Sequence, residues 1–254
     1  MWDNSMPFGS GPEIQQTQCG EHRLANLCYV VDLGHLDYLR SLAAQDQIVE
    51  RRKRNEIPDC LLFVQYPPVI TLGRTGKMDH LLVSELELRT NGVGFFPANR
   101  GGDITYHGPG QLVAYPVLDL RNRGKDIGHY LRNLESCIMT TLKDFGILAR
   151  RIPGVTGVWV GEEKIAAIGI RTSQWICSHG LALNVSTDLS YFSLIVPCGL
   201  DSKRVTSMSK LLGIEVQISQ VKERFCLHFG KIFERTPVSS PPWVGSFFDP
   251  CEDI

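Results

Sequence analysis

Residues 156–185 read TGVWVGEEKIAAIGIRTSQWICSHGLALNV, and this stretch indicates the fold class. Three runs rich in β-branched and apolar residues, 157–160, 164–172 and 175–185, follow one another, and a turn at Gly161–Glu163 separates the first two. Strands joined by turns this short pair antiparallel, because a parallel pair needs a crossover of about a dozen residues or more. The stretch therefore predicts consecutive hairpins.

The flanking sequence predicts helices inserted between further strands. Additional strands are expected at 24–33, 59–66 and 69–72, and two more within 101–120 on either side of the residues HGPG. Helices are expected at 35–55, 84–89, 126–145, 186–192 and 217–234. Because strands and helices do not alternate regularly, we expect an α+β domain with a mixed or antiparallel sheet.

Two of these helices carry specific signals. Ser84 and Glu87 are spaced as a capping box at the start of the helix at 84–89. The helix at 35–55 is expected to bury one apolar face, made of Leu36, Leu39, Leu42, Ala43 and Val49.

The composition is that of an ordinary globular protein without a strongly charged partner. The chain has 254 residues, and its 26 Lys and Arg nearly balance its 27 Asp and Glu, for a formal net charge of −1. This balance gives no electrostatic reason to expect binding of nucleic acid or an anionic membrane. No apolar run reaches the roughly 18 residues of a membrane span. The expected organisation is a loose tail at 1–23, one domain at 24–236 and a second tail at 237–254.

The eight cysteines are expected to be free thiols. They contain no C-x-x-C pair, and the polar N-terminal stretch has no apolar signal segment, so the reducing cytoplasm is the expected compartment. A mitochondrial or plastid location stays open. No metal site is expected, because His107, Cys177, His179 and Cys198 lack the paired spacing of structural zinc ligands.

One thiol stands apart from the other seven. Cys198 lies in a turn between Pro197 and Gly199, where a side chain is presented to solvent. The others fall in expected tails, helices or strands. Cys198 is therefore the best candidate for a nucleophile.

Three further segments could carry chemistry. Residues 99–111 hold four glycines, which fits either a plain hairpin turn or a loop that approaches a ligand. Lys164 is interpreted either as a solvated lysine at a hairpin mouth or as a desolvated lysine with a lowered pKa. The small residues after it leave volume for an acyl chain. His179, in an apolar strand, is favoured as a structural residue over a base.

Taken together, these segments resemble the octanoyltransferases of lipoate biosynthesis, also called lipoyl(octanoyl) transferases or the lipoate-protein ligase B family. The resemblance covers about residues 27–212. It is carried by RGGDITYHGPGQ at 100–111, TGVWV at 156–160, KIAAIG at 164–169, SHGLALN at 178–184 and PCG at 197–199.

The resemblance implies a fold, an activity and a site. The fold is that of the biotin and lipoate protein ligase catalytic domain, a mixed sheet with flanking helices. The activity moves an octanoyl group from acyl carrier protein, through a thioester on Cys198 with Lys164 as acid and base, to a lysine of a lipoyl domain. Acceptors are the lipoyl domains of 2-oxoacid dehydrogenase complexes and the glycine cleavage H protein, and no cofactor is needed. The implied substrate-binding residues are Arg100, Gly101, Gly102, Asp103, Ile104, Thr105, Tyr106, His107, Ala167, Ile168, Gly169, Gly180, Leu181 and Ala182.

Three alternatives are weighed against this reading. A lipoate or biotin ligase shares the fold but activates a free acid with ATP, and the PCG and TYHGPGQ segments favour the transferase over it. A cysteine hydrolase using Cys198 and His179 lacks an evident acid to orient the histidine. A non-enzymatic acyl-binding module would not need both Lys164 and Cys198.

Overall fold

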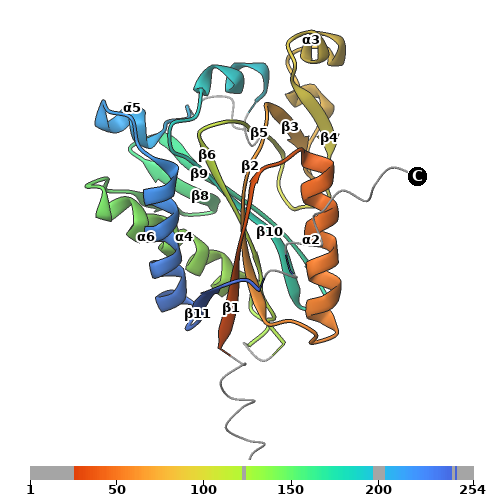
Figure 1. Ribbon diagram of the computed structural model, residues 1–254. Helices are drawn as coiled ribbons and strands as arrows, with labels where there is room; N and C mark the ends of the chain where they lie inside the picture. Colours follow the sequence, from red (N-terminus) through yellow and green to blue (C-terminus); the bar gives the residue numbers. More distant parts are fainter. Residues whose placement is uncertain (1–25, 122–123, 197–203, 242–243, 245–254) are drawn as a thin grey trace, which may run out of the picture.

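A mixed sheet forms the centre of the molecule (Figure 1). The computed structural model describes residues 26–121, 124–196, 204–241 and 244. In these residues eight strands form one sheet in the order β11-β1-β2-β6-β10-β9-β8-β7. Their bounds are β1 Leu27–His35, β2 Asp59–Gln65, β6 Gln111–Val117, β7 Arg150–Ile152, β8 Val155–Val160, β9 Glu163–Ser173, β10 Ile176–Asn184 and β11 Thr236–Ser239.

The strands β8, β9 and β10 pair antiparallel in succession, as residues 156–185 predict. Gly169 of β9 lies opposite Gly180 of β10, and Lys164 lies opposite Trp159 of β8 next to an irregularity in the register. The sheet is mixed because β1 runs parallel to both β2 and β11, while the other neighbouring strands of the sheet pair antiparallel. The expectation of an α+β fold with a mixed sheet is confirmed.

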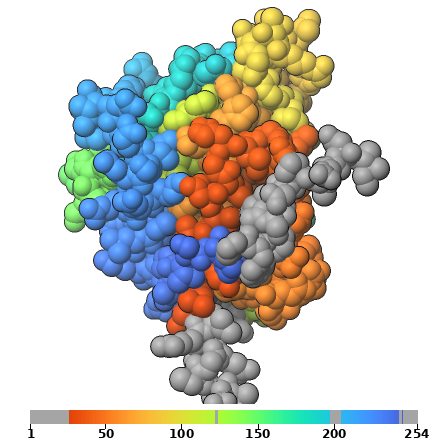
Figure 2. Space-filling view, in the orientation of Figure 1, coloured from red at the N-terminus to blue at the C-terminus, as the bar shows by residue number. Residues whose placement is uncertain are grey.

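Helices cover both faces of this sheet (Figure 1). Helix α2 (Tyr38–Lys53) packs on one face, and α4 (Ile127–Asp144) and α6 (Ile218–Ile232) pack on the other. Figure 2 shows the same orientation in space-filling form, with blue residues of the C-terminal part on the left and orange-red residues of the N-terminal part in the middle. Among the described helices, none is both long and apolar enough to cross a membrane.

Strand β2 shows why the central strands read as continuous apolar runs. Leu61 and Phe63 pack into the cluster beneath α4 and α6, whereas Leu62 and Val64 pack into the cluster beneath α2. Successive side chains of a strand point to opposite faces, so a strand covered on both faces needs apolar residues at every position. Strand β10 is likewise buried at all of its residues.

A second, smaller sheet lies beside the first. It has the order β4-β3-β5 and consists of β3 (Val69–Leu72), β4 (Gly94–Pro97) and β5 (Ile104–His107). It packs with α3 (Glu85–Thr90) and the 3-10 helix η2 (Leu189–Leu194) around a third apolar cluster. A further 3-10 helix, η1, spans Met78–His80. The predicted capping box of Ser84 and Glu87 is present at the start of α3.

The hairpin alternative for the glycine-rich segment 99–111 is wrong. Its two strands do not pair with each other, because β5 belongs to the small sheet and β6 to the large one. The residues HGPG therefore form a connection between sheets. Gly110 has a φ of +79°, and an added Cβ there would lie 2.6 Å from the carbonyl oxygen of Ser186. Only glycine fits this close approach.

The buried face of α2 differs from the expected apolar stripe. Leu39 is 56% exposed, and the buried residues are Tyr38, Ser41, Ala44, Gln45, Ile48 and Val49. Two of these are polar and are held by hydrogen bonds. The Ser41 hydroxyl lies 2.6 Å from the Tyr66 hydroxyl, and the Gln45 side chain accepts the backbone N–H of His179. A pattern based on hydrophobicity alone misses such a face.

The C-terminal boundary also needs correction. The tail expected at 237–254 overlaps β11. This strand pairs with β1 in the register Leu27↔Thr236 to Val30↔Ser239. Val244 is fully buried in the cluster beneath α2. The N-terminal tail expected at 1–23 lies outside the described residues. Helix α5 spans Met208–Leu212 and precedes α6.

Candidate active site

A cavity lies between the small sheet and strands β9 and β10. Most of the predicted substrate-binding residues line it, together with Tyr115 of β6, which the sequence reasoning missed. The lining residues are Arg100, Gly102, Asp103, Ile104, Thr105, His107, Tyr115, Ala167, Ile168, Gly169, Gly180, Leu181 and Ala182. The structure thus brings together residues from three separate motifs. We call this space the acyl cavity.

Two predicted binding residues do not line the acyl cavity. Tyr106 points into the third apolar cluster, where its ring stacks on Tyr191 with centroids 4.9 Å apart. Gly101 is a packing residue: its N–H donates to the carbonyl of Ile170 at 2.8 Å. A Cβ on Gly169 would lie 2.8 Å from the carbonyl oxygen of Gly101. The two glycines therefore let the loop backbone lie against β9.

Arg100 holds the glycine-rich loop in place and is itself only 8% exposed. Its guanidinium donates to the carbonyl oxygens of Gly101 and Asp103, and to both the carbonyl and the hydroxyl oxygen of Thr71 on β3, at 2.8–3.1 Å. Four hydrogen bonds from a planar, always charged group fix the loop against the small sheet. Arg100 acts on the cavity by shaping its wall.

A second cavity continues the first toward Lys164. It is lined by Thr105, Gln111, Lys164, Ala166, Ala167, Ala182, Asn184, Phe192 and Val205. Thr105, Ala167 and Ala182 line both spaces, so the two form one path along β9 and β10. Alanines line the middle of this path. Their small side chains leave space that larger side chains would occupy.

Lys164 stands at one end of this path and is buried, with 7% exposure. The interpretation as a solvated lysine at a hairpin mouth is therefore wrong. Its Nζ lies 5.2 Å from the centroid of the Trp159 ring, within the range of a cation–π contact. Gly157, with a φ of +128°, makes room for it, since an added Cβ would lie 2.6 Å from Lys164 Cε.

The position of Gly157 is in turn fixed by a buried carboxylate. The Gly157 N–H donates to Glu135 of α4 at 3.1 Å. Glu135 is fully buried and forms ion pairs with Arg132 and Arg151 at 2.7 and 2.8 Å. A buried charge with two partners and a backbone donor is a rigid support. The backbone beneath Lys164 is thus anchored to α4.

The backbone of Lys164 is bridged to Val205. The Lys164 N–H donates to the carbonyl of Arg204 at 2.9 Å, and Thr206 N–H donates to the carbonyl of Lys164 at 2.9 Å. Val196 N–H donates to the carbonyl of His80 at 2.8 Å. Residues 197–203, which include the predicted nucleophile Cys198, lie outside the described residues, but both ends of the segment are attached to this region.

The two histidines of the motifs are buried and hydrogen-bonded. Nδ1 of His107 lies 2.8 Å from Gln111 Oε1, and Nε2 of His179 lies 2.7 Å from Asn99 Oδ1. Burial lowers the pKa of His107 to about 4 and that of His179 to about 3. Both rings are therefore neutral at pH 7. The expectation that His179 is a satisfied structural residue agrees with this geometry.

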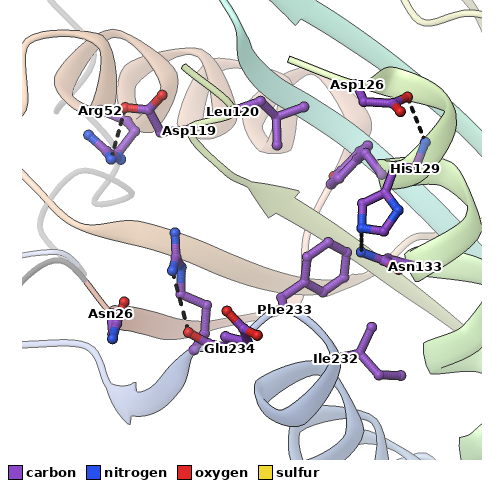
Figure 3. A pocket seen from close by; sticks show the side chains of 12 residues that line it. Asn26, Arg52, Asp119, Leu120, Asp126, His129, Asn133, Ile232, Phe233 and Glu234 are labelled. Atoms are coloured by element: carbon purple, nitrogen blue, oxygen red, sulfur yellow. Dashed lines mark hydrogen bonds and ion pairs between the residues drawn. The ribbon is translucent and has the colours of Figure 1, made fainter. Parts of the chain in front are cut away.

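A larger cavity, of about 560 Å³, lies beyond the opposite end of β6 from Gln111 (Figure 3). Figure 3 shows that its polar groups already bind one another: Arg52 pairs with Asp119, and His129 contacts Asp126 and Asn133. None of the predicted site residues lines it. In the described part of the chain, no three His, Cys, Asp or Glu side chains are grouped so as to hold a metal ion.

Comparisons with known proteins find relatives over most of the chain. The family model described as the lipoyl protein ligase A/B catalytic domain matches residues 37–230. The chain is 55% identical to an octanoyltransferase of Solibacter usitatus over 207 residues, which are 82% of this chain and 93% of that one. It is 48% identical to an octanoyltransferase of Caldicellulosiruptor saccharolyticus, over 82% of this chain and 88% of that one.

Solved structures show the same fold at low sequence identity. A crystal structure of lipoate-protein ligase A bound with ATP is similar with a TM-score of 0.72 and 19% identity, over 87% of this chain and 92% of that one. A bipartite lipoate protein ligase from Thermoplasma acidophilum is similar with a TM-score of 0.70 and 20% identity, over 88% of this chain and 91% of that one. At this identity the likeness establishes the arrangement of elements.

Proposed function

The chain belongs to the octanoyltransferases of the lipoyl protein ligase A/B catalytic-domain family, and from that premise we propose that it works by a relay through Cys198. In this relay an octanoyl group passes from an acyl carrier protein to Cys198 as a thioester, and then to a lysine of a lipoyl domain. The observation that carries the proposal is the path from the acyl cavity to the buried Lys164.

The five described thiols are unsuited to be the nucleophile, which leaves Cys198 together with Cys19 and Cys251. Burial raises the pKa of all five, to about 12 for Cys60 and Cys177 and to about 11 for Cys226. The pKa values of Cys28 and Cys137 are also raised by burial. A thiol must lose its proton to attack, so these five are poor nucleophiles. Cys198 follows Val196 by two residues, and Val196 is attached beside the site.

In the first half-reaction, the Cys198 sulfur attacks the carbonyl carbon of the donor thioester. The Lys164 amine accepts the thiol proton, a new carbon–sulfur bond forms, and the bond to the donor sulfur breaks. The resulting ammonium returns the proton to the departing phosphopantetheine thiolate. Thioester is exchanged for thioester, so the step needs neither ATP nor a cofactor. The Trp159 ring faces the ammonium that forms.

In the second half-reaction, the amine of the acceptor lysine attacks the Cys198 thioester. The Lys164 amine accepts a proton from the attacking nitrogen, the amide bond forms, the carbon–sulfur bond to Cys198 breaks, and the proton passes to the leaving Cys198 sulfur. Donor and acceptor are both carried on proteins, and a covalent intermediate lets them bind in turn. We propose the lipoyl domains of 2-oxoacid dehydrogenase complexes and the glycine cleavage H protein as acceptors.

The acyl chain itself supplies binding energy. Six or seven buried CH₂ groups are worth roughly 5 kcal/mol at about 0.8 kcal/mol each. The alanines and glycines of β9 and β10 form the walls of the acyl cavity. The nucleophile must stay reduced, so we propose a reducing compartment, the cytoplasm, as the location.

Intact-mass measurement tests the proposal. Incubation with octanoyl–acyl carrier protein is expected to add one octanoyl group, and peptide mapping to place it on Cys198. The Cys198→Ser variant is expected to give no thioester, whereas Cys226→Ser, which changes a half-buried thiol on α6, is expected to react like the wild type. An adduct on another residue contradicts the mechanism. Loading of free octanoate with ATP in the Cys198→Ser variant would favour a ligase instead.

A further inference from the structure

A third cavity continues the path from Lys164 to the surface. It has a volume of about 460 Å³ and is lined by Glu163, Leu189, Phe192, Ser193, Arg204, Val205 and Lys210. Phe192 and Val205 line both this space and the cavity at Lys164. The acyl cavity, Lys164 and this space therefore follow one another in series. We call the third space the surface groove.

The charges of the surface groove leave one cation uncompensated among the described residues. Lys210 forms an ion pair with Glu163 at 2.9 Å, which cancels both charges. Arg204 is exposed and forms no salt bridge with any described carboxylate. Its backbone is fixed, because its carbonyl accepts the N–H of Lys164. This backbone hydrogen bond fixes the position of the Arg204 backbone relative to Lys164, and the Arg204 guanidinium extends from there.

Part of the lining of the surface groove is apolar. Phe192 is 9% exposed and stands at the inner end of the groove, where it also lines the cavity at Lys164. Leu189 and Val205 add further apolar contacts. A ligand that fits must therefore be apolar along part of its length, narrow enough to enter toward Lys164, and anionic at its outer end.

On the basis of the proposed function, we propose that the surface groove binds the 4′-phosphopantetheine arm of the acyl donor, with Arg204 at its phosphate. This arm carries the acyl thioester at one end, a dimethyl-substituted segment in the middle and a phosphate at the other end. The thioester would lie at Lys164, and the dimethyl segment against Phe192 and Leu189. A guanidinium matches phosphate geometry with paired hydrogen bonds.

The test compares two small donors that differ only in the phosphate. Octanoyl-4′-phosphopantetheine and octanoyl-pantetheine are each used to acylate the enzyme, and kcat/KM is measured for both. The wild type is expected to prefer the phosphorylated donor by about fivefold or more, as one partly exposed ion pair allows. Arg204→Ala is expected to abolish most of that preference. Arg204→Lys is expected to retain part of it, because the charge remains.

Arg89→Ala is the matched control. Arg89 is an exposed arginine on α3 outside the groove, so this variant is expected to keep the wild-type ratio of the two donors. An Arg204→Ala variant with an unchanged ratio overturns the groove assignment, and so does a wild type without preference. If the wild type is acylated by neither donor nor by octanoyl–acyl carrier protein, the proposed function fails instead.

Discussion

The Nζ of Lys164 lies 5.2 Å from the centroid of the Trp159 ring, its partner on the neighbouring strand β8. Both side chains are buried. A cation over an aromatic ring in a desolvated place is worth about 1–2 kcal/mol, and tryptophan is the best ring for it. The pair positions the amine that the proposed mechanism uses in both half-reactions.

Trp159→Leu is expected to slow acylation of the enzyme about tenfold, since Lys164 loses the ring that holds its ammonium. Single-turnover rates with octanoyl–acyl carrier protein measure the effect. Trp175→Leu is the control, because Trp175 is 36% exposed and contacts Lys125, outside the cavities. Equal rates in the two variants would show that the Trp159 ring does not position Lys164.

Gly157→Ala is expected to reduce the same rate by about tenfold or more. The new Cβ would lie 2.6 Å from Lys164 Cε, so the lysine must move. Gly154→Ala also places a residue with a Cβ at a positive φ, +75°, but nothing lies within 4 Å of that Cβ. A normal rate in Gly154→Ala separates a general backbone effect from the contact with Lys164. A normal rate in Gly157→Ala would contradict the assigned role.

Stability is expected to fall as the pH drops below about 6.5, the ordinary pKa of histidine in an unfolded chain. The pKa is lowered to about 4 for His107 and about 3 for His179. Between these values and 6.5 the unfolded chain binds more protons than the folded protein, so acid favours unfolding by up to about 1.4 kcal/mol per pH unit for each ring. Urea midpoints measured between pH 7.5 and 5 test this.

Single-histidine variants identify the source of the pH dependence. His107→Gln and His179→Asn are each expected to flatten the decline, because a residue that does not titrate replaces the buried ring. Asparagine is chosen at 179 because the backbone there has a φ of +55°, which asparagine tolerates. If the pH dependence is the same in both variants and in the wild type, other groups cause it.

Asp59→Asn is expected to destabilise the protein by about 3 kcal/mol or more without touching the active site. Asp59 is 2% exposed and pairs with Arg52 and Arg235 at 2.6–2.8 Å, so its loss removes the carboxylate that pairs with the buried Arg235. Asp32→Asn, which breaks an exposed pair with Lys222, is expected to cost less than about 1 kcal/mol. Urea denaturation measures both. A normal acylation rate is expected for folded Asp59→Asn.

The sequence predicted those parts of the fold and site that are encoded locally. The hairpins of 157–185 follow from short turns, and α4 and α6 form where helices are expected, at 126–145 and 217–234. The predicted substrate-binding residues from Arg100 to Ala182 line one cavity, with Gly101 and Tyr106 as exceptions. Lys164 could not be recognised as buried from spacing alone, because its burial depends on Trp159, Gly157 and the chain at Val205.

The parts that were missed depend on distant partners. Strand β11 is only four residues long and begins Thr-Pro, so its pairing with β1 is invisible in the local pattern. The connection from β5 to β6 resembles a hairpin in sequence, and only tertiary pairing assigns its strands to different sheets. Tyr115 reads as one more core residue of β6. Its place at the acyl cavity appears only when β6 and β10 are paired.

The backbone bridge between Lys164 and Val205 limits how this protein can diverge. Only residues 199–203 separate Cys198 from Arg204, whose carbonyl is bound to Lys164. A substitution within residues 199–203 changes the chemistry of this segment. An insertion or deletion instead changes the distance that the chain can span between the Cys198 thiol and the Lys164 amine. We therefore expect descendants of this gene to vary there in composition while keeping its length.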